Sequence, residues 1–284
     1  FIKTCPELMI GLSSPRESLR LIERKGEERK IVITSSGEDL TEKMDTFSAA
    51  YIKKLKTKNV DGFLLKAKSP SCGISNVRVY HGIGKAHTKS SKESGMFGGA
   101  IINNFPGYPI ENERRLSNYQ IRDRFFTEIF VYAEYREMRD GFKFKDLVNF
   151  HSKNKYLFMS YNQAGLKRLG QIVANKEKLD YETVLESYLQ ELRVLLSKEP
   201  SKKRRINVLQ HIYGYFKDLI GDELKEYYFE LETQYLDGQI PYSNVLALLY
   251  SFSIQYNSIY IKNQTIFKPY PKELIQVTDS GKKV

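Results

Sequence analysis

The sequence predicts an α/β domain followed by an all-α domain, and three observations support this division. Before about residue 105, short apolar runs alternate with a helical pattern and Gly-rich loops, which favours a parallel α/β sheet. Pro and Gly then interrupt the chain at residues 105–109 (FPGYP). Beyond that break, apolar residues recur at helical spacing. We therefore expect one domain over residues 1–108 and a second over residues 109–284.

Three elements are predicted in the first half. Residues 31–34 form a strand, because they are rich in β-branched side chains. Residues 40–58 form a helix with Thr41 as N-cap. Residues 63–67 form a short buried strand. Residues 74–100 contain five glycines, so we expect a loop there.

The second half is predicted to be a bundle of roughly seven helices. Apolar residues follow an i+4 spacing over residues 116–138, and a similar stripe covers residues 181–198. A third helix over residues 222–236 ends at Gly238, a typical C-terminal stop. Pro241 suits the first turn of a further helix that runs to about Gln255.

The composition excludes several classes of protein. With 41% hydrophobic and 13% aromatic residues, the chain is not a disordered one. No apolar run approaches the roughly 20 residues of a membrane span, and two cysteines are too few for a disulfide scaffold. We therefore expect a cytoplasmic protein.

Charge favours a polyanionic partner. The formal net charge is +11, and residues 1–110 contribute 18 basic and 11 acidic side chains, a local excess of +7. The excess does not identify which polyanion it is.

Both cysteines lie where chemistry is expected. Cys72 belongs to KSPSCG at residues 68–73, directly after the predicted strand at 63–67, and Cys5 belongs to CPE after residues 1–4, which resemble the remainder of another strand. Because sites in α/β folds gather at the carboxyl ends of strands, the two thiols are predicted to meet. The alternative, that each cysteine is a small buried hydrophobe, stays open.

These motifs resemble a known family. CPE and KSPSCG, together with GLSSPR at residues 11–16, resemble the thiouracil desulfidase (TudS-like) family. The helical half resembles a YbgA-like domain through FHSKNK at 150–155, NVLQHIYGYFK at 207–217 and KPYP at 268–271. The fused arrangement resembles tRNA 4-thiouridine desulfidases (RudS-like), in which the helical domain is implicated in tRNA binding.

The resemblance implies a Rossmann-like sheet and a [4Fe-4S] cluster with one iron not bound by protein. Cys5 and Cys72 would be two of its three ligands, and the open iron would take the sulfur of a thiocarbonyl base. Glu7 would act as acid and base, and Ser69 would orient the water or the base. The alternatives are that Glu7 caps a helix or pairs with Arg16, and that Ser69 only shapes the turn.

The chain departs from the family pattern in one respect. The family has a further cysteine in an N-terminal strand, and this chain has none. Three explanations are open: an incomplete chain, a relative without a cluster, or a ligand from elsewhere such as His81. We expect an incomplete chain, with the first strand of the sheet and the third cysteine upstream of Phe1.

RNA contacts are predicted from basic side chains in both halves. His151, Asn154 and Lys155 are expected to share one helix face, and Asn207, His211 and Tyr215 another. The alternative is that the basic run at 202–205 is a solvated turn and that the histidines are structural. The predicted RNA-binding residues are Arg78, Lys85, Lys89, His151, Lys155, Lys202, Lys203, Arg204 and Arg205, with Lys92 beside them.

The leading hypothesis is an enzyme, an iron–sulfur-dependent desulfidase that replaces the sulfur of 4-thiouridine in tRNA by oxygen without net redox change. The expected partner is the tRNA substrate, with no membrane and no obligate protein partner. A second hypothesis is a desulfidase of free thiouracil or thiolated nucleotides. A third is a non-catalytic tRNA-binding or stress-response protein.

Overall fold

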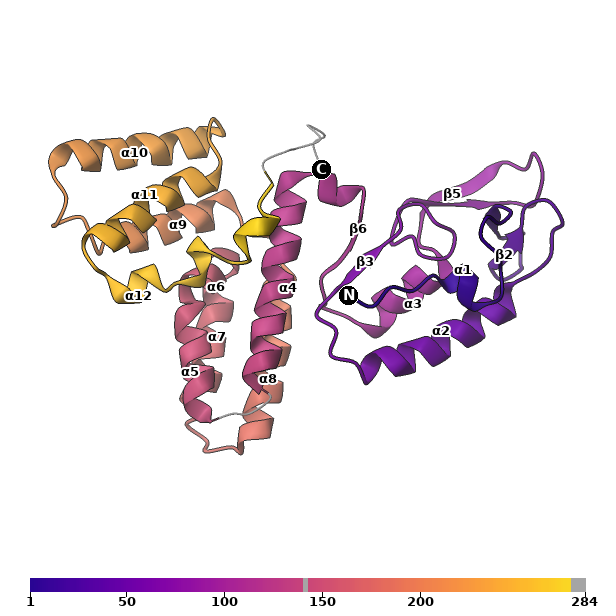
Figure 1. The fold of residues 1–284 in the computed structure, drawn as a ribbon, viewed down its shortest axis with the longest axis horizontal. Helices are drawn as coiled ribbons and strands as arrows, with labels where there is room; N and C mark the ends of the chain where they lie inside the picture. Colours follow the sequence, from indigo (N-terminus) through magenta and orange to yellow (C-terminus); the bar gives the residue numbers. More distant parts are fainter. Residues whose placement is uncertain (140–142, 277–284) are drawn as a thin grey trace. The chain divides into compact units, whose positions relative to one another are not determined.

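The computed structural model describes residues 1–139 and 143–276, which form two compact units (Figure 1). Of the described residues, 1–129 together with 275 and 276 belong to the first unit, and 130–139 together with 143–274 belong to the second. This division lies later in the chain than the predicted boundary at residue 108. One reason is packing, since a Cβ atom on Gly62 would lie 2.9 Å from a side-chain carbon of Ile129.

The order of elements follows the predicted division into α/β and all-α parts. In the first unit the elements are α1 (Pro6–Met9), β1 (Leu19–Ile22), β2 (Lys30–Ile33), α2 (Thr41–Lys56), β3 (Phe63–Leu65), β4 (Val77–Tyr80), β5 (Thr88–Glu93), α3 (Met96–Asn104), β6 (Ile110–Asn112) and η1 (Arg115–Ser117), and α4 (Tyr119–Arg139) crosses into the second unit. The second unit continues with α5 (Phe144–Lys153), α6 (Lys155–Tyr161), α7 (Gln163–Ala174), α8 (Tyr181–Leu196), α9 (Lys202–Tyr213), α10 (Asp222–Asp237), α11 (Tyr242–Gln255), α12 (Ile259–Lys262), η2 (Thr265–Phe267) and η3 (Lys272–Leu274).

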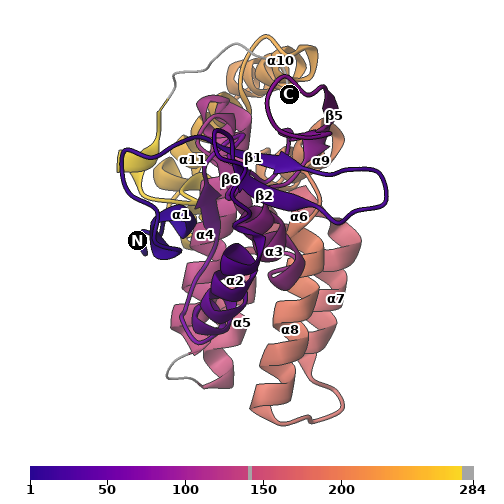
Figure 2. The same cartoon turned by 90° about the vertical axis from the view of Figure 1, so that its right-hand side faces the viewer.

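The first unit confirms the α/β prediction and adds detail to the sheet. One sheet has the order β2-β1-β4-β5, in which β1 and β4 are parallel and the two outer pairs are antiparallel. A second sheet consists of the parallel pair β3 and β6, with Phe63 opposite Ile110. Helices α2 and α3 pack against each other, as Figures 1 and 2 show. The sheets are therefore mixed in direction, with a parallel pair in each.

Three predictions of detail in the first unit are wrong. Residues 1–5 lead directly into α1 and form no strand. Thr41 is the first residue of α2 and not its N-cap, because its Oγ1 accepts the N–H of Ile31 at 3.1 Å instead. Residues 74–100 contain β4, β5 and the start of α3. Strand β5 was not predicted because its side chains are polar and largely exposed, so it lacks the apolar pattern of a strand. Its pairing with β4 is made by the backbone.

The second unit confirms the all-α prediction with more helices than expected. Of the described residues after 109, nine α-helices are formed, from α4 to α12. Short helices account for the excess: α6 begins directly after Asn154, which ends α5, and α12 has four residues. The predicted face of His151, Asn154 and Lys155 is therefore interrupted at Asn154. The predicted stripe from Asn207 also fails, because α9 ends at Tyr213 before Tyr215.

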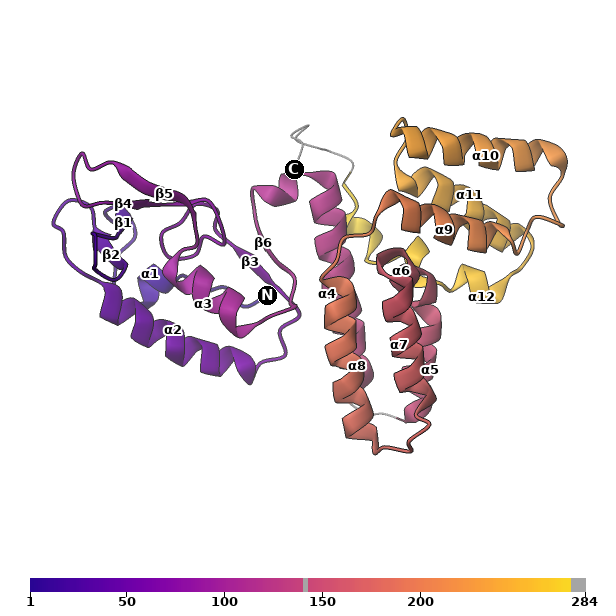
Figure 3. The same cartoon turned by 180° about the vertical axis from the view of Figure 1, so that it is seen from behind.

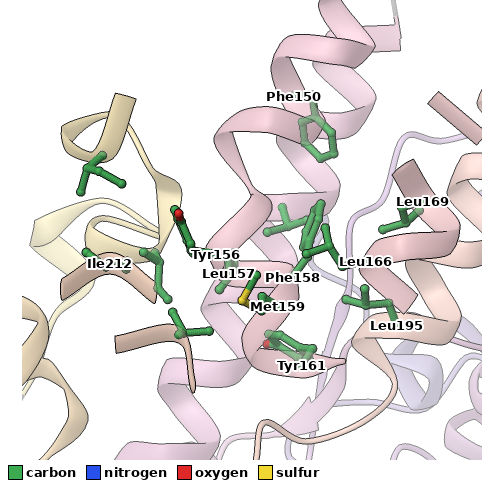
Figure 4. Packing of buried hydrophobic residues seen from close by; sticks show 14 of the residues in the cluster. Phe150, Tyr156, Leu157, Phe158, Met159, Tyr161, Leu166, Leu169, Leu195 and Ile212 are labelled. Carbon is green, nitrogen blue, oxygen red and sulfur yellow. The ribbon is translucent and has the colours of Figure 1, made fainter. Parts of the chain in front are cut away.

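The core of the second unit surrounds α6 (Figure 4). Its consecutive residues Tyr156 to Tyr161 are all buried, so that this short helix is covered on every side. Buried residues of α8, including Tyr188 and Leu192, belong to the same core and come from the predicted apolar stripe. In the described part of the chain, no helix combines the length and the apolar character needed to cross a bilayer.

Candidate active site

The Cys72 loop is fixed by the first turn of α3. The N–H of Gly95 donates to the carbonyl of Gly73 at 2.7 Å, and the N–H of Gly98 donates to the carbonyl of Ser71 at 2.9 Å. Met96 donates in the same way to Pro70 at 3.1 Å. The N–H groups at the start of a helix lack partners within the helix, so α3 uses them to hold the loop.

Two glycines permit this close approach. A Cβ atom at residue 98 would lie 2.6 Å from the carbonyl oxygen of Cys72, and one at residue 95 would lie 2.6 Å from that of Ser71. Both distances are shorter than real Cβ contacts, and the obstacle is backbone that cannot swing aside. Gly95 and Gly98 are therefore structural requirements of the Cys72 loop rather than signs of a flexible segment.

Glu7 is the carboxylate at the centre of the site. It is buried in α1, with 9% of its surface exposed, two residues after Cys5. The Nε–H of Arg16 donates to Glu7 Oε2, and the second amino group of Arg16 donates to the Cys5 sulfur at 3.5 Å. Burial opposes the charged guanidinium, but the hydrogen bond and charge of Glu7 outweigh burial and raise the pKa of Arg16. Arg16 therefore fixes the carboxylate and places a positive charge beside the Cys5 sulfur.

Two serine hydroxyls lie near the other oxygen of Glu7. Ser71, which is fully buried, donates to Glu7 Oε1, and the Ser69 hydroxyl lies 3.4 Å from that oxygen and 2.9 Å from the Ser71 hydroxyl. Ser69 also accepts the backbone N–H of Cys72 at 3.1 Å. Since each hydroxyl has one proton, a chain in which Ser69 donates to Ser71 and Ser71 to Glu7 satisfies these contacts. The loop is thereby connected to the carboxylate by hydrogen bonds.

The two cysteines lie at one site. Burial raises the pKa of the Cys72 thiol to about 11; the Ser71 hydroxyl, 3.7 Å from the sulfur, opposes this shift, whereas the charges of Glu7 and Cys5 add to it. Cys5 and Cys72 are linked by one set of contacts, since Arg16 contacts the Cys5 sulfur and Glu7, and Ser71 contacts Glu7 and lies 3.7 Å from the Cys72 sulfur. Cys5 begins a helix rather than ending a strand, so the strand-end argument drawn from the sequence does not apply to it.

The site contains residues that the sequence alone did not assign to it. Ser71 and Arg16 contact Glu7, and Gly95 and Gly98 hold the loop. Arg16 was foreseen only as the alternative partner of Glu7, and that ion pair is present together with the serine contacts. The position of Ser71 next to Cys72 could have indicated that it belongs to the site. Nothing in the sequence indicates the role of the two glycines, because that role depends on contacts between segments distant in sequence.

The thiols alone fall short of an iron–sulfur ligand set. Clusters of this kind take three or four thiolates, and the sequence contains two cysteines. His81, the alternative ligand, is exposed in the β4–β5 hairpin. Among residues 1–139 and 143–276, no group of three His, Cys, Asp or Glu side chains could hold a metal ion. The residues present therefore do not complete a cluster site.

The basic residues predicted near the site lie on the outside of the β4–β5 hairpin. Arg78 is exposed on β4, while its neighbours Val77 and Val79 point into the core. Lys85 is exposed in the connecting loop. Lys89 instead forms an ion pair with Glu23 at 2.7 Å. These placements leave Arg78 and Lys85 accessible to a phosphate, and they give Lys89 a role within the sheet.

His151 has a structural contact in the second unit. Its Nδ1 lies 3.0 Å from the hydroxyl of the buried Tyr188. Burial, with a smaller effect from the positive charge of Lys155, lowers the pKa of His151 to about 4. A neutral histidine attracts phosphate less than a charged one, so the structural interpretation of His151 is favoured by its surroundings.

The basic run at the start of α9 also makes contacts within the fold. Lys202 donates to the carbonyl of Leu236 at 3.0 Å, at the C-terminal end of α10, where a cation is favourable. Arg204 donates to the carbonyl of Glu199 at 3.4 Å. The Arg205 guanidinium lies 5.0 Å from the ring centre of Tyr242, and Lys203 is exposed. Part of this run therefore stabilises helix packing.

The chain therefore consists of an α/β domain, in which a carboxylate and two cysteines belong to one site, and a helical domain that follows it. Residues 1–113 match the family described as 2-thiouracil desulfurase, and residues 155–271 match a family of unknown function, DUF1722. The chain belongs to the 2-thiouracil desulfurase family through its first domain and carries a DUF1722 domain after it. This confirms the resemblance drawn from the sequence and indicates desulfidase activity on thiouracil-like substrates.

Two relatives correspond to the two parts. The chain is 32% identical over 123 residues to "Uncharacterized protein YbbK" of Bacillus subtilis (strain 168), which covers 41% of this chain and 76% of that protein. It is 26% identical over 161 residues to "Uncharacterized protein YbgA" of Escherichia coli (strain K12), which covers 56% of this chain and 95% of that protein. No solved structure matches the chain.

Proposed function

We propose that this protein replaces the thiocarbonyl sulfur of 4-thiouridine in tRNA by oxygen and releases sulfide. The observation that supports this proposal is the Glu7 carboxylate, fixed by Arg16 and hydrogen-bonded to Ser71, beside Cys5 and Cys72 in a 2-thiouracil desulfurase domain. The net charge of +11 and the second domain favour a polyanionic substrate over a free base.

The reaction needs a mobile proton and no oxidant. Water adds to the C–S carbon and loses a proton. The C–S bond then breaks, and the hydrogen sulfide that leaves takes that proton and the remaining proton of the same water, whose oxygen becomes the carbonyl oxygen. Glu7 can take the first proton on Oε1, the oxygen that accepts from Ser71, and return it to the departing sulfur. Arg16 holds Oε2 throughout, so the carboxylate keeps its orientation.

The Ser69–Ser71 pair has a positioning role in this proposal. Ser69 is fixed by the N–H of Cys72, and its hydroxyl lies within hydrogen-bonding distance of Ser71. When Glu7 becomes protonated, Ser71 can turn its proton toward Cys72 or Ser69, because both lie near its oxygen. The loop can thus adapt to either state of the carboxylate without moving its backbone.

Cys5 and Cys72 are proposed as two thiolate ligands of a [4Fe-4S] cluster, which would bind the substrate sulfur at an open iron. With two thiolates in the sequence, we expect anaerobic reconstitution of this chain to give fewer than four irons per protein and a labile complex. Iron and sulfide analysis measures this; a full, stable complement would contradict the expectation.

The function is tested by desulfurisation itself. Anaerobically reconstituted protein of measured iron content is incubated with tRNA that contains 4-thiouridine, and nucleosides are quantified by mass spectrometry. We expect uridine to appear at the expense of 4-thiouridine. Unchanged 4-thiouridine would refute the proposal.

A carboxylate substitution tests the role of Glu7. Glu7→Gln preserves the shape of the side chain but removes the proton acceptor, and we expect a loss of about 100-fold or more in the rate of sulfide release. Glu17→Gln is the matched control, because Glu17 is exposed in the same segment. Equal rates in the two variants would assign Glu7 a structural role.

A second substrate class is favoured by the family description, which names 2-thiouracil. Comparing initial rates on free thiouracil and on thiolated tRNA separates the two. A faster rate on the free base at equal concentration would favour that second candidate.

A further inference from the structure

An aromatic pair is exposed on the second unit. Tyr215, in the segment after α9, and Tyr260, in α12, expose 46% and 38% of their surfaces. Their ring centres are 6.2 Å apart, with an angle of 37° between the planes. The two tyrosines are far apart in sequence and meet only through the fold, so together they form one aromatic surface.

A buried tyrosine packs against this aromatic surface. Tyr156, a core residue of α6 that Figure 4 labels, lies with its ring centre 6.4 Å from that of Tyr260. Tyr156 is 2% exposed, which anchors the exposed ring against a fixed partner. The ammonium group of Lys155 lies 5.4 Å from the Tyr156 ring, so that a positive charge adjoins the aromatic surface.

Charge is segregated among the helices around this pair. The sequences of α6, α9, α11 and α12 contain no aspartate or glutamate and six basic residues: Lys155, Lys202, Lys203, Arg204, Arg205 and Lys262. Helix α10 has the opposite composition, with six carboxylates against Lys225. Figures 1 and 3 show α9 and α11 between α10 and α12. The acid nearest to Tyr215 in sequence, Asp218, acts electrostatically on Lys225 of α10.

We propose that Tyr215 and Tyr260 form a stacking surface for unpaired nucleobases of the RNA substrate, with Lys155 beside it to contact the backbone phosphate. Exposed rings next to a cation, near α6, α9, α11 and α12, whose sequences contain no carboxylate, suit a base and its phosphate. The buried ring of Tyr156 restricts the motion of Tyr260, which reduces the entropy lost when a base stacks on the pair. The identity of the ligand as RNA rests on the proposed function.

The absence of tryptophan from the sequence gives a direct probe. Tyr260→Trp places a single tryptophan at the surface, and a base that stacks on it will quench its fluorescence. We expect quenching when a single-stranded RNA oligonucleotide is added to the full-length variant. Tyr227→Trp is the control: Tyr227 is also exposed, at 47% against 38% for Tyr260, but lies on α10 among Glu223, Glu226 and Glu230. Equal quenching of the two variants would overturn the proposal.

Affinity provides the second readout. We expect Tyr215→Ala with Tyr260→Ala to weaken binding of unmodified tRNA about 10-fold in fluorescence anisotropy. The double Phe variant keeps both rings and should bind within about 2-fold of the unchanged chain. Tyr227→Ala should have no effect. Unchanged affinity in the double Ala variant, with an unchanged melting temperature, would overturn the proposal.

These measurements separate failure of the stacking surface from failure of the proposed function. Binding of unmodified RNA needs no desulfurisation, so ring-dependent binding without conversion of 4-thiouridine would leave the surface standing and reject the enzyme activity. Conversion of 4-thiouridine by a double Ala variant that binds tRNA normally would reject the surface alone.

Discussion

The Cys72 loop and the basic run of α9 show how differently two sequence motifs can be used by a fold. Around Cys72 the polar groups converge, since Glu7, Arg16 and Ser71 contact one another at a loop held by backbone hydrogen bonds. The cations of residues 202–205 instead contact separate parts of the fold: Lys202 donates a hydrogen bond to the end of α10, and Arg205 lies against Tyr242.

In this protein, the motif that forms a site is the one whose backbone is held by another segment of the chain. In the loop at 69–73 the N–H groups of Ser71, Cys72 and Gly73 bond within the loop, to Ser69. The first turn of α3 supplies the donors for three of the loop's carbonyls. A helix already satisfies its backbone, so its charged side chains are free to cap and pack against neighbouring helices.

The largest effect should come from breaking the support of the Cys72 loop. Gly98→Ala places a methyl group against two backbone carbonyls, and we expect the free energy of unfolding of the first unit to fall by about 3 kcal/mol. Desulfidase activity should be lost with it. Gly99→Ala is the control in the same helix, because its Cβ meets a rotatable Ser94 hydroxyl. Urea unfolding followed by circular dichroism compares the two; equal stabilities would show that the loop can move away from α3.

A pH experiment sharpens the structural role of His151 in the second unit. Its folded pKa of about 4 lies below the ordinary value of 6.5, so the unfolded chain binds more protons and stability falls as pH falls from 6.5 toward 4. The stability lost between about pH 6.5 and pH 5 should be at most about 2 kcal/mol.

His151→Gln removes the titrating group and should remove this part of the pH dependence. His211→Gln, at an exposed position on α9, is the matched control. Unfolding curves measured at both pH values give the difference. A variant that keeps the full slope would mean that other groups cause it.

The smallest effect tests the basic run. Lys202→Met removes the cation at the end of α10 and should lower stability by about 0.5–1 kcal/mol. Lys203→Met, at an exposed neighbouring position, should leave stability within about 0.5 kcal/mol of the unchanged chain. Thermal unfolding at low ionic strength measures both, and equal losses would mean that the Lys202 contact adds nothing.

Part of the fold was predictable because it depends on local patterns. The helices at 181–196 and 222–237 follow from apolar spacing, and Gly238 ends the second with a φ of 78°. The strand β5 escaped prediction, since its polar side chains carry no alternating pattern and its pairing with β4 is made by the backbone. Likewise Asn154, which interrupts the helix after His151, has no proline or glycine beside it to mark the break.

Some residues of the candidate site could be predicted from the sequence and others could not. Cys5, Glu7, Ser69 and Cys72 were expected at one place because short motifs carry them, and the structure places them together. Ser71 and Arg16 needed coordinates, because a hydroxyl or guanidinium next to a motif residue can point in several directions.

The sequence by itself determined the α/β and all-α parts, the two cysteine motifs and the excess of positive charge, since each is a property of residue type and spacing along the chain. Only the tertiary structure decided that Gly95 and Gly98 hold the Cys72 loop, that Lys202 caps a helix, and that Tyr215 meets Tyr260. Those outcomes depend on contacts between segments distant in sequence, where packing in three dimensions selects the partners.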